Sequence, residues 1–553
     1  MSISFSPHYT SRLTGEGEFR LLTVQPELGE DQRIQSEAAN KGITNSATHY
    51  IRCDGNAVLI TKNLHDILQR MFWIDSICIN QRDEIERTSQ VSLMASIYQS
   101  ADKVIAWLGE ADIYTEDAFS LIRAMGALPE GNLKQIISKS LGSEDLMNAL
   151  GPLSNNWTWT SMKQLWRCNY FKRAWIIQDI ALAKKILVNC GEYILDWDHI
   201  FQVSRISSLT PWKRVLNMEP HDQKDRVDSA HTLPLYLNSN RKLVFQGKHC
   251  HLLYILIKAR RFQCADPRDK VYALLGLLGD QAKVKMRPQP VYKDCSFADT
   301  YSFTAIQILE DTNDLLLLAH AEGQDFQNIE DLPSWVPDWS CEKGLGLGIT
   351  GYTRFAATAS LPRFLMIDES NRSLVLHGLW LDRIVEVGES KDDAINHRDL
   401  AYFPSWISIL SALPPRYHTG QATTEVFWRT LITDTAAPIF QPARHPAADE
   451  FKFAFCNKPI SMEKRRFLEG LERLGAPDKT GLINDSDCSP LLPHTDSSDL
   501  PDAGDYEVHL NYSSQTRLVR TNNNYLSLAT TSVRENDSVW IVAGFATVTT
   551  IIG

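Results

Sequence analysis

One strand-like apolar run that contains a carboxylate constrains the fold of this chain more than any other feature. "FWIDSICI" covers residues 72–79 and places Asp75 among apolar side chains. A fully buried strand normally reads as a continuous apolar stretch, and an ionised carboxylate inside one is costly unless it is paired or hydrogen-bonded. The run therefore predicts a buried strand in which Asp75 is either a structural anchor or part of a site.

A helix and a second apolar run follow this segment. Asp83 is predicted to cap the helix with Glu86 as its capping-box partner, and apolar residues at helical spacing continue it to about residue 101. "KVIAWLGE", residues 103–110, then predicts a second buried strand. Strand, helix and strand at this spacing indicate a βαβ unit, hence a parallel sheet in an α/β domain. Ligands bind at the carboxyl ends of such strands, which is where residues 78–81 would lie.

The rest of the chain divides into segments of different pattern. We expect an α/β domain over residues 15–190, a mainly helical middle region over 191–340, and a mixed α+β region over 341–553. A disordered Pro-, Asp- and Ser-rich loop is predicted near 476–505. Finer predictions are a hairpin around Asp54–Gly55 followed by a helix over 64–71, a helix and then a strand over 170–191, a helix from Trp197, strands over 373–388, helices over 400–475, and short strands over the last forty residues.

Composition narrows the possible classes of protein. The net charge of −11 over 553 residues gives no electrostatic footprint for nucleic acid. The first residues lack the apolar core of a signal peptide, and no apolar run reaches the roughly 18 residues of a membrane span, so we expect a soluble, cytoplasmic protein. Ten cysteines without a paired C-x-x-C arrangement predict neither a zinc site nor a disulfide framework. Phosphate-loop, H-E-x-x-H and G-x-S-x-G motifs are also missing from the sequence.

The run around Asp75 resembles the core of the fungal heterokaryon incompatibility (HET) domain. "WIDSICINQRDEIERTSQVSLMASIYQSADKVIAWLG" carries Trp-Ile-Asp, Cys-Ile-Asn-Gln, Glu-Arg with Gln-Val three residues later, Ile-Tyr and Trp-Leu-Gly in the family's order. "YFKRAWIIQDIALA", "DPRDKVYALLGL", "LPSWVPDWS" and "FWRTLITD" resemble further segments of these proteins. Two places depart from the family pattern: no Ala-Leu-Ser-Tyr-x-Trp-Gly strand precedes the Asp-Gly turn, and "ENDSVWIVAGFATVTTIIG" diverges after its first residues.

The resemblance implies a cytosolic trigger of regulated cell death, acting in allorecognition when incompatible hyphae of a filamentous fungus fuse. Its partners would be other incompatibility proteins or a second copy of the chain. The family is also thought to be remotely similar to TIR domains, some of which hydrolyse NAD, and this likeness implies the alternative of a NAD-cleaving enzyme that acts as the death effector. A third hypothesis is a diverged, inactive interaction protein. We expect no bound cofactor, and NAD would enter only as a substrate.

The candidate residues each have a functional and a structural interpretation. Asp75 is either a ligand-binding group or the partner of Arg87 or Arg173. Cys78 is either a reactive thiol or a small buried apolar residue. Asn80 and Gln81 either bind a ligand or satisfy backbone groups at the helix start.

The charged residues of the helix and of the second motif have similar alternatives. Glu86 is the candidate general base, with helix capping as its structural role, and Glu84 is the second candidate. The Arg268–Asp269 pair is interpreted as a structural lock. The candidate set comprises the catalytic candidates Glu86 and Glu84, and the motif residues Asp75, Cys78, Asn80, Gln81, Arg87, Gln90, Arg173 and Gln178. No metal ligands are predicted.

Overall fold

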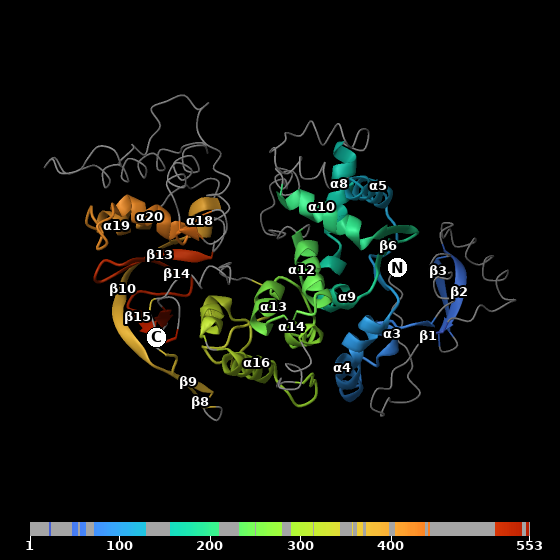
Figure 1. Ribbon diagram of the computed structural model, residues 1–553, viewed down its shortest axis with the longest axis horizontal. Coiled ribbons are helices and arrows are strands. Elements are labelled where there is room, and N and C mark those ends of the chain that lie inside the picture. Colours follow the sequence, from blue (N-terminus) through green and yellow to red (C-terminus); the bar gives the residue numbers. More distant parts are fainter. Residues whose placement is uncertain are drawn as a thin grey trace. The chain divides into compact units, whose positions relative to one another are not determined.

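The architecture comes from a computed structural model, shown in Figure 1. The chain divides into two compact units, residues 1–300 and 301–553, and each is described by itself. The predicted boundaries at 190 and 340 stay predictions. The structure describes residues 22–23, 47–53, 56–61, 71–128, 155–209, 232–248, 250–278, 289–312, 314–342, 357, 362–368, 372–396, 404–436, 441–442, 515–544 and 549–551.

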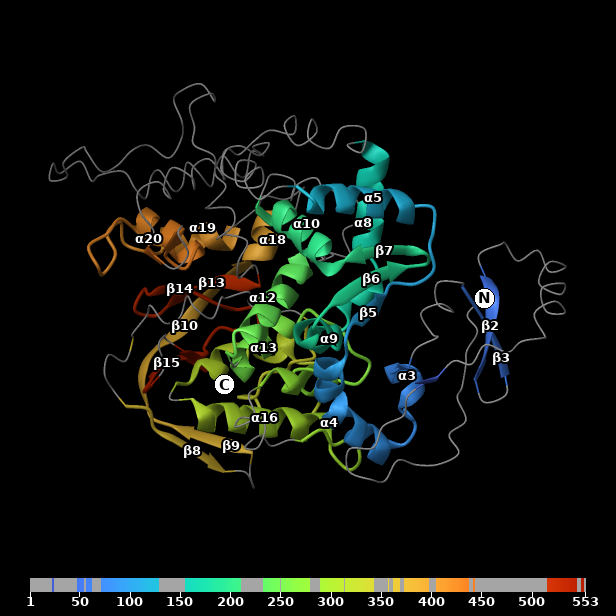
Figure 2. The ribbon, with the colours of Figure 1, turned by 45° about the vertical axis from the view of Figure 1, so that its right-hand side comes forward.

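A three-stranded sheet lies within unit 1 (Figure 2). Its order is β5 (Val104–Trp107), β6 (Ile186–Cys190) and β7 (Tyr193–Asp196). β5 and β6 are parallel, while β7 returns antiparallel beside β6. Gly191 makes the turn into β7 with a φ of +52°, and a Cβ there would lie 2.7 Å from the Ala111 side chain, so glycine suits both the backbone and the space. The chain is therefore of the predicted α/β class and contains a parallel strand pair.

The parallel pair differs from the predicted one. Residues 72–79 do not form one strand: β4 (Met71–Phe72) pairs with β1 (Leu22–Thr23), and α3 (Asp75–Cys78) is a single helical turn. The physical reason is local, because Asp75 Oδ1 accepts a hydrogen bond from the Ser76 backbone N–H at 2.8 Å, a bond that competes with strand pairing. The parallel partner of β5 comes instead from β6, some eighty residues later.

The helix predicted after Asp83 is present in unit 1 as α4. Asp83 caps α4 through its Oδ1, which accepts the Ile85 and Glu86 N–H groups at 3.2 Å each. α5 buries one apolar stripe, Ala118, Leu121, Ile122 and Met125, at helical spacing. The helical elements are α4 (Glu84–Ser100), α5 (Thr115–Gly126), α8 (Asn156–Trp166), η2 (Asn169–Lys172), α9 (Ile176–Leu182), α10 (Trp197–Leu209), α12 (Leu233–Phe245), α13 (Leu252–Ala259), α14 (Asp269–Tyr272), η4 (Leu275–Leu277) and α16 (Phe297–Asp311), the last crossing into unit 2.

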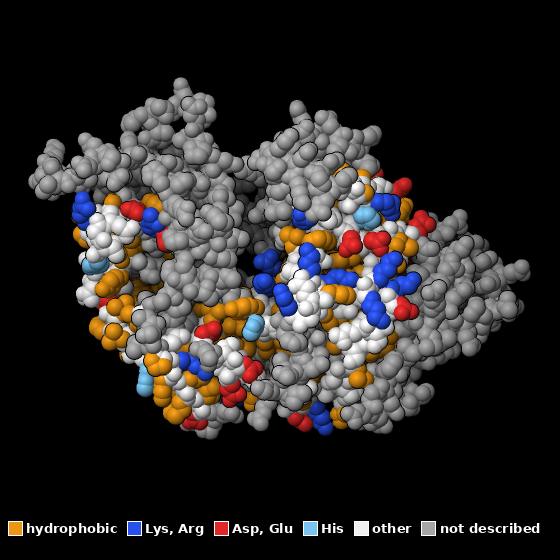
Figure 3. All heavy atoms as spheres, viewed as in Figure 1, with side chains coloured by type: hydrophobic (Ala, Val, Ile, Leu, Met, Phe, Trp, Pro, Cys, Tyr) orange, Lys and Arg blue, Asp and Glu red, His pale blue; other side chains and the backbone are white. Residues whose placement is uncertain are grey.

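Two further features of unit 1 bear on the predictions. β2 (Ala47–Cys53) and β3 (Asn56–Thr61) pair antiparallel on either side of Asp54–Gly55, as the predicted hairpin requires. The helix expected over 64–71 lies largely outside the described residues, and Met71 itself belongs to β4. On the face shown in Figure 3, Lys and Arg side chains of unit 1 gather beside hydrophobic ones although the whole chain is acidic.

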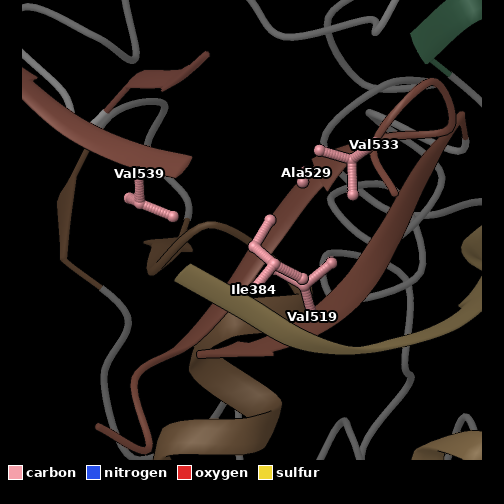
Figure 4. Close-up of a cluster of buried hydrophobic side chains, with 5 residues drawn as sticks. All are labelled: Ile384, Val519, Ala529, Val533 and Val539. Carbon is pink, nitrogen blue, oxygen red and sulfur yellow. The ribbon is translucent and has the colours of Figure 1, made fainter. Parts of the chain in front are cut away.

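Unit 2 is organised by a five-stranded antiparallel sheet. Its order is β14 (Leu526–Thr530), β13 (Thr516–Thr521), β10 (Gly378–Ser390), β15 (Ser538–Val542) and β16 (Thr549–Ile551). β10 is the central strand and pairs with both β13 and β15. One buried cluster drawn in Figure 4 consists of Ile384, Val519, Ala529, Val533 and Val539. Burial of these branched side chains ties the last forty residues to a strand more than a hundred residues earlier.

The remaining elements of unit 2 are short. β9, β10 and β13–β16 lie where strands were predicted, and α19 and α20 lie within the region 400–475 predicted as helical. The short antiparallel pair β11–β12 also lies in that region, where helices were predicted. The predicted disordered loop near 476–505 lies outside the described residues. The elements are η5 (Leu316–His320), η6 (Gln324–Phe326), β8 (Leu365–Asp368), β9 (Ser373–Leu376), α18 (Lys391–Asn396), α19 (Pro404–Ser411), α20 (Thr423–Leu431), β11 (Thr435–Ala436) and β12 (Gln441–Pro442).

Candidate functional site

The segment of residues 78–81 is held by hydrogen bonds from its own neighbourhood. Cys78, 2% exposed, accepts the Ile74 N–H at its Sγ at 3.3 Å. The Gln81 side-chain amide donates to the Asp75 carbonyl at 3.1 Å, and Asn80 Oδ1 accepts the Arg82 N–H at 3.2 Å. These contacts match the structural interpretation of each residue, because each side chain satisfies a backbone group of the α3–α4 connection.

The Glu86 side chain accepts a hydrogen bond from Asn80, whereas in a capping box it would accept from the N-cap residue Asp83. Its side chain is completely buried, and Oε1 accepts the Asn80 N–H at 2.9 Å. The Asp83 N–H, which a capping box would pair with Glu86, donates to the Asn80 carbonyl at 3.1 Å. Glu86 therefore braces the segment 78–81 from the first turn of α4, whereas Glu84 is exposed on the outer side of that turn.

Asp75 and Arg87 take different partners. Asp75 Oδ2 lies 3.7 Å from an Arg173 guanidinium nitrogen, so of the two predicted partners the structure brings Arg173 to it. The two side chains are 37% and 52% exposed, respectively, which makes this a solvent-screened ion pair of small energetic value. Asp75 is thus not buried in a strand. Because its carboxylate is partly exposed to solvent, it avoids the desolvation cost expected for a buried charge.

Arg87 joins α4 to the segment 266–292. Its guanidinium lies 3.4 Å from Asp266 and 3.1 Å from Asp269, and it stacks over the Tyr292 ring at 3.6 Å from the centroid. Asp269 also accepts hydrogen bonds from Trp175 Nε1 at 3.1 Å and from the Tyr292 hydroxyl at 2.6 Å. We call these five residues the Arg87 clamp. It connects three segments that are far apart in the sequence.

The pKa values of the two carboxyl groups in the Arg87 clamp shift in opposite directions. Burial raises the pKa of Asp269, against the opposing effects of the Tyr292 hydrogen bond and the Arg87 charge. Burial acts in the same direction on Asp266, but hydrogen bonds and charge from Arg268 outweigh it and lower the pKa of that carboxyl. Arg268 bonds Asp266 at 2.9 Å, so the predicted Arg268–Asp269 pair is replaced by Arg268–Asp266 and Arg87–Asp269.

A third polar group surrounds Asp179 on α9. Its carboxyl accepts a hydrogen bond from the Tyr98 hydroxyl on α4. Burial, and then repulsion from the Asp75 carboxylate, raise the pKa of Asp179 from 3.8 to about 7, against the opposing effects of Tyr98 and Arg173. The residue keeps a partly exposed surface, although its Oδ1 is shielded from solvent. A carboxyl that titrates near neutral pH is suited to accept or donate a proton there.

Further aromatic side chains belong to the surroundings of Tyr98 and Asp179. The Trp73 and Tyr98 rings meet edge to face with centroids 5.7 Å apart. Burial, followed by the charge of Asp179, raises the pKa of Tyr170 well above its ordinary value, so Tyr170 lies within electrostatic range of the same carboxyl. We call Trp73, Asp75, Tyr98, Tyr170, Arg173 and Asp179 the Asp179 cluster.

Two glutamines of the candidate set are buried between elements. Gln90, 1% exposed, lies on α4, and Gln178, 2% exposed, lies on α9. A Cβ at Gly276 would overlap the Gln178 amide and approach Ala95, so the glycine allows η4 to lie against both helices. Gln178 is therefore placed at a packing contact within unit 1. The functional roles of all the candidate residues stay predictions.

The sequence-based candidate set omitted Asp179, Tyr98 and Tyr170. Asp179 lies in "WIIQDIAL", a carboxylate inside an apolar helical run, and this is the same kind of signal that drew attention to Asp75. Tyr98 entered the sequence analysis within the helical run up to residue 101 and in the Ile-Tyr element, without an assigned role. Its hydrogen bond to Asp179 joins residues 81 positions apart, which no local pattern indicates.

The described residues offer neither a metal-binding cluster nor a membrane-spanning helix. Within the described ranges, no group of three or more His, Cys, Asp or Glu side chains could hold a metal ion. Nor is any described helix both long enough and apolar enough to cross a bilayer.

Comparisons with known proteins place the Asp179 cluster and residues 78–81 inside one family match. Residues 30–179 match the family model described as heterokaryon incompatibility protein (HET). The heterokaryon incompatibility protein 6, OR allele, of Neurospora crassa is 28% identical over 366 residues, which cover 57% of this chain. The match spans 52% of that relative, about half of its length. No solved structure matches the chain.

Proposed function

We propose that this chain, whose residues 30–179 match the model of the heterokaryon incompatibility (HET) family, is a fungal allorecognition protein whose HET domain triggers regulated cell death after incompatible hyphae fuse. The family match over residues 30–179 carries this proposal, together with the similarity to a protein named for heterokaryon incompatibility. The domain could trigger death by binding a partner protein or by catalysing a reaction, and the side chains described above bear on both mechanisms.

The geometry of α4 supports a signalling surface held in one conformation. Glu86 braces residues 78–81 from inside, and the next residue, Arg87, joins the same helix turn to the Arg87 clamp. On the same turn, Glu84 and Ile85 are exposed, and Ile85 keeps 49% of its surface in solvent. An apolar side chain flanked by charged ones on a braced helix start suits contact with another protein. The partner is a second incompatibility protein or a second copy of this chain.

One observation favours a second candidate, cleavage of NAD by the HET domain. The Asp179 cluster contains a carboxyl with a pKa of about 7 that accepts the Tyr98 hydroxyl and interacts electrostatically with Arg173 and Tyr170. Perturbed carboxyls of this kind concentrate at reaction sites, although structural networks also produce them. Of the two glutamates first considered for this chemistry, Glu84 is exposed and Glu86 is buried against backbone.

The test is induced expression of the full chain in a filamentous fungus, followed by vital-dye staining and measurement of cellular NAD. Each variant is also fused with tester strains of different incompatibility type. We expect death with the wild type, and its loss in Glu86→Ala because residues 78–81 lose their buried brace. Asp102→Ala is the matched control, since it removes an exposed carboxylate just after the end of the same helix, away from the proposed contact surface, and it should still kill.

The outcomes separate the candidates. Death with unchanged NAD supports signalling through a partner, and NAD loss that precedes death supports the enzyme. Survival of every wild-type strain at confirmed protein levels, before and after fusion, contradicts the proposed function and favours the diverged, inactive copy.

A further inference from the structure

The loop after β5 and the turn after β6 are joined to each other at one edge of the unit 1 sheet. The Gly191 N–H in the turn donates to the Gly109 carbonyl in the loop at 2.8 Å, and a Cβ on Gly191 would lie 2.7 Å from the Ala111 side chain. Both segments follow the carboxyl ends of parallel strands, which is the edge where α/β proteins bind their ligands. In Figure 2 the loop leads from β5 to α5, which packs beside α8.

Three large side chains form an apolar and aromatic surface beside this loop. Ile113 in the loop is 72% exposed, and Trp157 at the start of α8 is 48% exposed. The Tyr114 ring lies against the Trp157 ring with centroids 5.2 Å apart. The Trp157 indole N–H donates to Asp117 Oδ2 at 2.7 Å, which holds the exposed ring in place. Aromatic side chains fixed in this way lose little conformational entropy on binding, and Trp and Tyr dominate the energetics of protein interfaces.

Carboxylates border these side chains. Glu110, Asp112 and Glu116 are exposed in the same segment, and none of the three forms an ion pair within the described part of the chain. Arg123, the basic residue of α5, donates to the Ile194 carbonyl at 3.0 Å instead. The border therefore has an uncompensated negative charge. We call the six residues of this patch the Trp157 surface: Glu110, Asp112, Ile113, Tyr114, Glu116 and Trp157.

The turn after β6 adds to the negative potential. Burial, and then the charges of Glu116 and Glu192, raise the pKa of Tyr193, whose hydroxyl donates to Glu116. Carboxylates have this effect because they oppose the formation of a further negative charge. The same charges attract a cation that approaches from solvent.

We propose that the Trp157 surface binds a basic segment of a partner protein in which arginine lies beside aliphatic side chains. An arginine guanidinium stacks over the exposed Trp157 ring, and an aliphatic side chain packs on Ile113. Further arginines pair with Glu110, Asp112 and Glu116. Charge complementarity selects this occupant, because an acidic segment would be repelled and a neutral one would leave the carboxylates unpaired.

The size of the Trp157 surface fits a segment rather than a whole folded partner. Ile113, Tyr114 and Trp157 together expose on the order of 300 Å² of side chain, whereas a standard interface buries about 800 Å² on each partner. The inference goes beyond the proposed function, since this surface uses none of the residues around Ile85 and its test requires no cell death.

The experiment measures binding of a fluorescent peptide to the purified full chain by anisotropy and by calorimetry. The probe is a short peptide that alternates arginine and leucine. One control peptide has glutamate in place of each arginine, and the other has serine in place of each leucine. We expect saturable binding of the probe with a Kd on the order of 10 μM at low salt, weakening as salt rises. Both control peptides should bind at least about tenfold more weakly.

Variants locate the site. Ile113→Ser, Trp157→Ala and Glu110→Lys should each weaken binding by about tenfold or more. Leu379→Ser is the control for Ile113→Ser, because it removes an aliphatic side chain that is 66% exposed on β10. Asp102→Lys is the control for Glu110→Lys, because it makes the same change in net charge before the other end of β5. Both controls should bind within about twofold of the wild type.

Circular dichroism establishes that each variant is folded. If Trp157→Ala is not, Ile113→Ser decides the matter, since its side chain is 72% exposed. Loss of binding in the surface variants and not in their controls supports the proposal.

Four results overturn the proposal. They are failure of the probe to saturate the wild-type chain, equal binding of the serine peptide, equal weakening by Glu110→Lys and Asp102→Lys, and unchanged binding by Ile113→Ser. Sedimentation of the chain alone tests another occupant: self-association that Glu110→Lys abolishes would assign the surface to a second copy and overturn this one. None of these results bears on whether the chain kills cells, so the two proposals fail separately.

Discussion

Asp179→Asn is expected to stabilise unit 1 at neutral and alkaline pH. The substitution keeps the size of the side chain and an oxygen that accepts from the Tyr98 hydroxyl, while it removes the charge that burial and Asp75 disfavour. Most substitutions of partly buried polar residues destabilise a protein, so a gain in stability is a distinctive outcome.

The magnitude follows from proton linkage. The pKa of Asp179 is about 7 in the folded chain and near 3.8 when unfolded, so the folded state binds more protons between these values. The stability that the protonated carboxyl contributes is complete below pH 3.8 and is lost as pH rises towards about 7. At 1.36 kcal/mol per pH unit the interval sets an upper bound of about 4 kcal/mol, and local relaxation reduces the expected gain to about 2–3 kcal/mol.

The assay is urea unfolding of the full chain at several pH values, followed by hydrogen exchange in peptides from α4 and α9. We expect the variant to exceed the wild type by this amount at about pH 8 and to approach it at about pH 4.5. Asp196→Asn, which changes an exposed carboxylate on β7, is the matched control and should leave the pH dependence unchanged. A variant no more stable than the wild type at high pH, or a gain that does not shrink on acidification, would refute the reasoning.

Two further predictions concern other charged groups. Arg87→Ala and Asp269→Ala should each destabilise unit 1 by about 2–4 kcal/mol, and a double-mutant cycle in urea should give a coupling of about 1–3 kcal/mol; additive effects would contradict a direct interaction. Burial lowers the pKa of Lys391 from 10.5 to about 7, so wild-type stability should rise with pH across that window. Lys391→Met should flatten this rise when thermal unfolding is followed from pH 7 to 10.5, and an unchanged slope would count against the buried amine as its source.

Local patterns predicted the elements whose signals are local. The α4 helix follows from Asp83 as its cap and from the apolar stripe behind it, and the hairpin follows from its Asp-Gly turn. The strand predicted over 72–79 failed because one side-chain bond, from Asp75 to the Ser76 N–H, favours a helical turn over extended backbone. Apolar runs of this length do not distinguish the two by periodicity.

The site was less accessible to prediction for a different reason. Asp75, Cys78 and Glu86 stood out through neighbours within a few residues, and their bonds to Ser76, Ile74 and Asn80 are local as well. The Asp179 cluster and the Arg87 clamp depend instead on distant pairs such as Tyr98–Asp179, 81 residues apart, and Arg87–Asp269, 182 residues apart. A single sequence carries no information on which distant charges meet, because folding brings them together through the packing of apolar faces.

The Arg87 clamp has a consequence for inheritance. Its arginine and its two aspartates are encoded 179 and 182 codons apart, and only the first lies within the stretch that defines the family. A crossover between diverged alleles in this interval would combine the arginine of one parent with the acidic segment of the other. The recombinant keeps the clamp only where both parents encode complementary charges at these positions. We therefore expect recombinants that separate a complementary pair to be less stable than either parent, so that the two stretches would be inherited as a linked pair.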